Sequence, residues 1–92
     1  MQIEYNKQQL DTLYYCITLI IRKDMSINRA YSRIKEQKVY ISRTAFYTLA
    51  SSMQTLHTLA EANVNEEVID KVAARLNVLE IWNGYKTWRT LI

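Results

Sequence analysis

Apolar residues near the start of the chain recur at intervals of 3, 4 and 3 positions, which is the spacing of one face of a helix. The residues of this stripe are Leu10, Leu13, Ile17 and Ile20. Asn6 precedes the stripe, and Gln9 lies three positions after Asn6, a pairing typical of a capping box. Tyr14 and Ile21 widen the apolar face, so we expect this helix to be buried on more than one side.

Two further helical stripes follow, each preceded by a serine that can cap a helix. Ser26 precedes the stripe Ile27, Ala30, Tyr31 and Ile34, which predicts a short helix over about 27–37. Residues 38–41 break the helical spacing and favour β conformation, so they predict an extended connection. Ser42 then precedes a longer stripe, and this predicts a third helix that ends near residue 62. The stripe consists of Phe46, Leu49, Met53, Leu56 and Ala60.

The last third of the chain predicts a fourth helix after Asn65 and a short final helix. Glu66 and Glu67 would lie in the first turn, where the helix dipole favours negative charge. The apolar spacing continues through Leu79 to Trp82, and 83–84 reads Asn-Gly, which favours a helix end. The sequence has one glycine and no proline, which argues against an all-β sandwich or barrel. We therefore predict an all-α fold, a compact bundle of four to five helices forming a single domain over 1–92.

Composition fits a globular chain that does not enter a membrane. The 92 residues are 49% hydrophobic and 23% charged, and the longest apolar run, 13–21, is too short to span a bilayer. The sequence does not open with the pattern of a signal peptide. Cys16 is the only cysteine, so no internal disulfide can form, and this favours a reducing compartment. These features predict a cytoplasmic protein.

Charge is distributed unevenly along the chain. The net charge is only +3, but residues 22–43 hold seven basic and two acidic side chains. Residues 61–80 hold five acidic and two basic side chains. The basic stretch could present a face suited to an anion, whereas the alternative is that both stretches are ordinary solvated surfaces.

The basic stretch also contains a recognisable sequence motif. A helix capped by Ser26 is followed by a connection and by a helix that opens Ser42-Arg-Thr-Ala-Phe-Tyr. Over 23–49 this resembles the helix-turn-helix of DNA-binding proteins. It is most similar to that of small plasmid-conjugation and mobilisation regulators and of resolvase-type recombinases, where an Ile-Ser-x-x-x-Phe-Tyr phrase opens the recognition helix. The usual turn glycine is missing, and Ala30 lies eleven positions before Ile41, which predicts a longer hinge than the usual interval of about five residues.

The resemblance implies which side chains would meet DNA. A recognition helix places its N-terminal residues on base edges in the major groove, while the preceding helix meets phosphates. The implied base contacts are Arg43, Thr44, Tyr47, Thr48 and Ser51. The implied phosphate contacts are Arg29, Arg33, Lys35 and Lys38. On this hypothesis the chain is a homodimeric protein that binds double-stranded DNA, either a transcription regulator or an accessory factor of a plasmid, phage or similar element.

An enzymatic function has little support in the sequence. His57 is the only histidine, and Cys16 lies in an apolar helix without a basic neighbour in sequence. One cysteine and one histidine cannot by themselves form a structural zinc site. Glu66, Glu67 and Asp70 fit a helix start better than a metal cluster. We therefore expect no catalytic residues, no metal and no cofactor.

The alternative hypothesis is a helical protein-interaction module, an adaptor or an inhibitor of a host protein that does not bind nucleic acid. It is motivated by the strongly apolar first helix and by the seven tyrosines and two tryptophans, since aromatic residues are frequent in binding hot spots. The residues expected at a dimer or partner interface are Tyr15, Leu19, Trp82 and Trp88.

Overall fold

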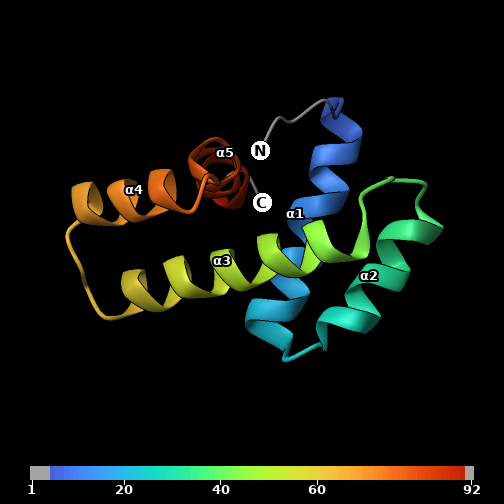
Figure 1. The fold of residues 1–92 in the computed structure, drawn as a ribbon, viewed down its shortest axis with the longest axis horizontal. Helices are drawn as coiled ribbons and strands as arrows, with labels where there is room; N and C mark the ends of the chain where they lie inside the picture. Colours follow the sequence, from blue (N-terminus) through green and yellow to red (C-terminus); the bar gives the residue numbers. More distant parts are fainter. Residues whose placement is uncertain (1–4, 91–92) are drawn as a thin grey trace. The chain divides into compact units, whose positions relative to one another are not determined.

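The computed structural model describes residues 5–90, and within them it contains five α-helices and no strand (Figure 1). The helices are α1 (Lys7–Lys23), α2 (Ile27–Glu36), α3 (Arg43–Glu61), α4 (Glu66–Arg75) and α5 (Leu79–Thr90). The predicted all-α class is confirmed. Within this part of the chain, every helix is too short or too polar to cross a bilayer. The chain packs as two compact units that divide between Ala50 and Ser51, inside α3, and each unit is described by itself.

The first unit contains α1, α2 and the start of α3. The predicted capping box of α1 is present: the Oδ1 atom of Asn6 accepts a hydrogen bond from the Gln9 amide at 2.8 Å, and Gln9 Oε1 accepts one from the Asn6 amide at 3.0 Å. Ser26 caps α2 through an Oγ atom that accepts from the Arg29 amide at 3.2 Å. α1 and α2 pack against each other, and Leu13 and Ile17 of α1 and Ala30 and Ile34 of α2 are buried in the core.

The connection between α2 and α3 covers residues 37–42 and forms no strand. Lys38 has a φ of 60°, in the left-handed region, and its amide donates to the Lys35 carbonyl at 3.0 Å. The Val39 amide donates to the Ile34 carbonyl at 3.1 Å, which completes a Schellman motif. Lysine therefore stands where glycine usually ends a helix. Ser42 Oγ accepts from the Ala45 amide at 3.1 Å, as its predicted capping role requires.

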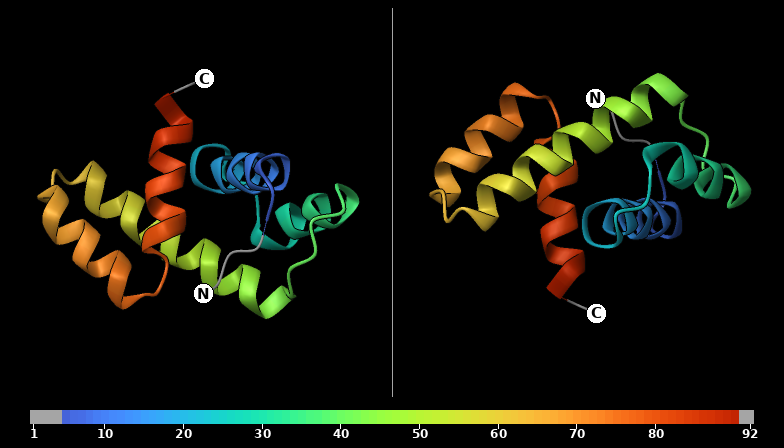
Figure 2. Two further views of the ribbon diagram at one scale, coloured as in Figure 1. Left: turned by 90° about the horizontal axis from the view of Figure 1, so that it is seen from above. Right: turned by 90° about the horizontal axis from the view of Figure 1, so that it is seen from below.

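The second unit contains the remainder of α3 with α4 and α5. α4 runs back alongside the end of α3, and α5 packs on α4 at a steep angle (Figures 1 and 2). Asn65 caps α4 by accepting from the Glu67 amide at 2.8 Å. Lys86 of α5 reaches Glu66 Oε1 at 3.1 Å and Asp70 Oδ1 at 3.4 Å, so two ion pairs link the exposed sides of these helices.

The boundary between the last two helices differs from the sequence prediction. α4 ends at Arg75, and the amide of Val78 donates to the Ala73 carbonyl at 2.9 Å around Asn77, whose φ is 61°. Residues 79–82 therefore begin α5 and do not extend α4. Gly84 lies within α5, so the helix stop predicted there is wrong. Burial of Trp82 and Tyr85 on either side of it outweighs the helix penalty of glycine, which is about 1 kcal/mol.

Candidate nucleic-acid interface

The N-terminal turns of α3 present a polar face to solvent. Thr44 and Thr48 are exposed and Tyr47 is half-buried, whereas Phe46 and Leu49 on the opposite side are fully buried. This division follows from the rotation of about 100° per residue in an α-helix. Four residues that were predicted as base contacts, Arg43, Thr44, Tyr47 and Thr48, thus belong to one accessible helix start. The fifth, Ser51, is also exposed but belongs to the second unit.

Arg43 lies at the edge of this face and is held against α2. Its Nη1 atom donates to Asn28 Oδ1 at 2.6 Å, and its guanidinium carbon lies 4.9 Å from the centroid of the Tyr31 ring. Arginine is attracted to the face of an aromatic ring at this range. Two residues of α2 therefore orient the first residue of α3.

Tyr31 joins the two helices of the candidate motif. Its side chain is 7% exposed, its ring lies 5.7 Å from that of Phe46, and its hydroxyl donates to the Ile41 carbonyl at 2.7 Å. The ammonium nitrogen of Lys35 lies 5.8 Å from the centroid of the Tyr31 ring, which the Arg43 guanidinium also contacts. Lys35 and Arg43 consequently occupy one corner between α2 and α3.

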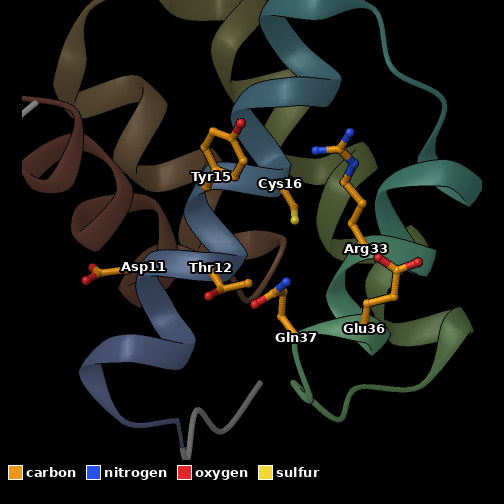
Figure 3. A pocket seen from close by; sticks show the side chains of 7 residues that line it. All are labelled: Asp11, Thr12, Tyr15, Cys16, Arg33, Glu36 and Gln37. Carbon is orange, nitrogen blue, oxygen red and sulfur yellow. The ribbon is translucent and has the colours of Figure 1, made fainter.

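The other predicted phosphate contacts lie elsewhere on this unit. Arg29, Arg33 and Lys38 are all exposed. Lys38 lies on the connection beside Tyr40, a tyrosine that is 76% exposed. Arg33 lies on the side of α2 that faces α1, where it lines a cavity (Figure 3). The basic residues are therefore spread around α2, and only Lys35 shares a corner with Arg43.

The cavity between α1 and α2 has a volume of about 510 Å³. Its lining consists of Asp11, Thr12, Tyr15, Cys16, Arg33, Glu36 and Gln37 (Figure 3). Burial raises the pKa of the Cys16 thiol, and the positive charge of Arg33 lowers it to a lesser degree. A thiol whose pKa is raised stays protonated at neutral pH and is a poor nucleophile. The cavity therefore has no activated nucleophile at its cysteine.

The residues predicted for a partner interface have different exposures. Tyr15 is 50% exposed, and Leu19 and Trp88 are half-buried. Trp82 is 2% exposed and lines a second cavity, of about 330 Å³, with Lys86 of the same helix. Its inclusion in the interface was wrong, because an indole this deeply buried cannot anchor a partner. It belongs to the core, as large aromatic side chains usually do.

Groups that could support catalysis or hold a metal are dispersed. The Nε2 atom of His57 lies 3.3 Å from Glu61 Oε1, one helical turn away. Over residues 5–90, histidine, cysteine, aspartate and glutamate side chains do not gather in threes as a metal site would require.

Sequence reasoning missed the roles of Asn28 and Tyr31 in the candidate interface. Tyr31 was correctly predicted as a core residue, but nothing in the helical spacing shows that it also stacks on Arg43. Asn28 is fifteen positions from Arg43, and the contact depends on how the connection folds. Comparison with known proteins adds no further indication: neither a protein-family model, nor a curated protein, nor a solved structure matches the chain.

Proposed function

We propose that this chain is a DNA-binding protein that inserts the N-terminal turns of α3 into the major groove. The observation that carries the proposal is the accessible start of α3, where Thr44 and Thr48 are exposed, Arg43 and Lys35 share the edge, and the exposed Lys38 lies on the preceding connection. Within residues 5–90, none of these three cations forms an ion pair with a carboxylate. Unpaired cations around a polar helix start suit a polyanion.

The side chains suggest a division of labour at the interface. Threonine hydroxyls can donate to or accept from base edges, and the threonine methyl group can contact the methyl group of thymine. Thr44 and Thr48, with Tyr47 beside them, would read bases. Arg29 and Lys38 would meet phosphates, which position a protein on DNA without reading sequence. The proposed role is transcription regulation or DNA assembly on a plasmid, phage or similar element, in a reducing compartment such as the cytoplasm.

A fluorescence-anisotropy titration of labelled duplexes tests the proposal. Neutralising about 4–6 phosphates should give a slope near −4 to −5 for the logarithm of the binding constant against the logarithm of salt concentration. Absence of binding to any duplex at low salt would contradict DNA binding outright.

The base-reading role of α3 needs a second experiment, on a duplex selected from a random library. The double variant Thr44→Ala, Thr48→Ala should lose most of the preference for the selected sequence over a scrambled one, because each lost base contact removes about 1–3 kcal/mol of discrimination. Thr87→Ala is the matched control, since Thr87 is an exposed helical threonine of α5. An unchanged preference in the double variant would exclude this face of α3 as the reading surface.

A protein-interaction module remains the second candidate function, and one observation favours it. Tyr15 is half-exposed at the rim of the cavity between α1 and α2, where an aromatic side chain could anchor a protein partner or a second copy of this chain. Light scattering coupled to size exclusion, with and without a duplex, separates the two functions. A change in mass only with DNA supports the first proposal, whereas a stoichiometric protein complex that lacks nucleic acid supports the second.

A further inference from the structure

Two cations share a single aromatic ring at the corner between α2 and α3. The Arg43 guanidinium carbon and the Lys35 ammonium nitrogen lie 4.9 and 5.8 Å from the centroid of Tyr31. Both side chains are exposed, and neither has a carboxylate partner among residues 5–90. Like charges repel each other, so an anion that contacts both cations would offset this repulsion.

The orientation of Arg43 separates it from the base-reading face. Arg43 precedes Thr44 by one residue and therefore points about 100° away from it around the helix axis, toward α2. Its Nη1 atom is engaged by Asn28, and its plane is packed on Tyr31. The guanidinium has further N–H donors, and because Arg43 is exposed these can meet an anion at this corner.

The start of α3 adds donors to the same corner. Ser42 Oγ accepts a hydrogen bond from the Ala45 amide, while the first-turn amides of Arg43 and Thr44 have no acceptor within the helix. The dipole of a 19-residue helix also favours negative charge at this end. These backbone groups reinforce a site that the two side chains define.

We infer that Arg43 and Lys35 together bind one phosphate of the DNA backbone, and that Asn28 and Tyr31 are positioning residues that hold Arg43 for this contact. The inference rests on the proposed function and changes one part of it. Arg43, which the resemblance assigned to base contact, has a sequence-independent role, and sequence is read by the threonines of α3.

Affinity measured across unrelated duplexes distinguishes the two roles of Arg43. Arg43→Ala should weaken binding to every duplex by a similar factor and reduce the magnitude of the salt slope by about 1, because one phosphate contact is lost. Lys35→Ala should act in the same direction, and the double variant should lose less than the product of the two single losses, since both residues serve one phosphate. Arg75→Ala and Lys71→Ala are matched controls, because both side chains are exposed cations of α4.

Asn28→Ala tests positioning separately from charge. It removes the hydrogen bond to Arg43 but no charge, so affinity should fall for every duplex while the salt slope stays that of the wild type. Circular dichroism of each variant verifies the helical fold. A loss confined to one sequence in Arg43→Ala would show a base contact and overturn the inference.

A titration with inorganic phosphate keeps this inference separate from DNA binding. At low ionic strength, phosphate should shift the NMR signal of the Arg43 Nε–H group in the wild type but not in Lys35→Ala. No shift in the wild type would overturn the phosphate site even if the protein binds duplexes. If phosphate shifts this signal but the protein binds no duplex, the proposal of DNA binding is wrong and the anion site is still supported.

Discussion

The hydroxyl group of Tyr31 donates a hydrogen bond of 2.7 Å to the carbonyl oxygen of Ile41, ten positions later. This bond ties the middle of α2 to the last residues before α3. It fixes the connection from which Arg43 emerges, while the ring of the same tyrosine packs on Phe46. The geometry of the candidate interface therefore depends on one partly buried phenol.

Removal of this phenol oxygen should destabilise the protein without dismantling the motif. Tyr31→Phe keeps the ring and deletes the bond to Ile41, so the free energy of unfolding should fall by about 1 kcal/mol, the net value of a typical hydrogen bond. Urea unfolding followed by circular dichroism measures the change. Equal stability of Tyr31→Phe and the wild type would mean that the Ile41 carbonyl is satisfied equally well by water.

Lys38 should be the costliest residue of the connection in terms of backbone conformation. Its φ of 60° is unfavourable for a residue with a Cβ atom, so Lys38→Gly should raise the free energy of unfolding by about 1 kcal/mol. The same variant removes a proposed phosphate contact and should lower DNA affinity. Stability and affinity would then change in opposite directions.

Asn63→Gly is the control for Lys38→Gly. Asn63 has the same φ of 60° and ends α3 with the same pattern of backbone bonds, but it lies in the acidic part of the chain. It should raise stability by a smaller amount, because asparagine tolerates this conformation better than lysine, and leave DNA affinity unchanged. A loss of affinity in Asn63→Gly would show that the effect at Lys38 does not come from its charge.

Gly84 should be replaceable by alanine with a gain in stability. It lies in the interior of α5 with a negative φ, so its conformational freedom serves no local purpose. Gly84→Ala should increase the free energy of unfolding by roughly 0.5–1 kcal/mol. Thermal unfolding gives the sign directly, and a lower melting temperature would reveal that the added methyl group meets a closely packed neighbour.

Cys16 should make stability depend on pH in the alkaline range. Burial raises the pKa of its thiol, so above about pH 8.5 the unfolded chain releases a proton that the folded protein retains. The folded state then binds more protons than the unfolded state, and the free energy of unfolding falls as pH rises through this range. Urea unfolding between pH 7 and 9.5 should show this fall in the wild type. Cys16→Ala lacks the thiol, and an equal fall in that variant would assign the effect to another group.

The helix starts could be predicted from sequence because each depends on residues two or three positions apart. Asn6, Ser26, Ser42 and Asn65 all accept hydrogen bonds from amides in the first turn of the helix that follows. Each contact joins residues within one helical turn, so the local sequence is enough to indicate where a helix begins.

The end of α4 and the continuity of α5 could not be predicted in this way. Leu76 and Leu79 have helical spacing, but the chain turns between them at Asn77. Gly84 lies inside α5 because its neighbours Trp82 and Tyr85 are buried. Packing between elements decides both outcomes, and it is absent from a single helical stripe.

The candidate interface was predictable in its exposure but not in its internal contacts. Periodicity places Thr44 and Thr48 outward, as the structure does. It cannot show that Arg43 packs on Tyr31 or that Arg33 faces α1, since both depend on how α2 is rotated against its neighbours. That rotation decides whether Arg43 packs against α2, where we propose a phosphate contact, or points outward with the two threonines.

The burial of Cys16 has a practical consequence, because it is the only sulfhydryl of the chain and is only 2% exposed. A cysteine introduced at the highly exposed Tyr40 would react with a maleimide dye while the native thiol stays protected. The fluorophore would then stand beside Lys38, on the connection that precedes α3. Binding of a ligand near this connection could thus be followed by the fluorescence of a single label, without first replacing Cys16.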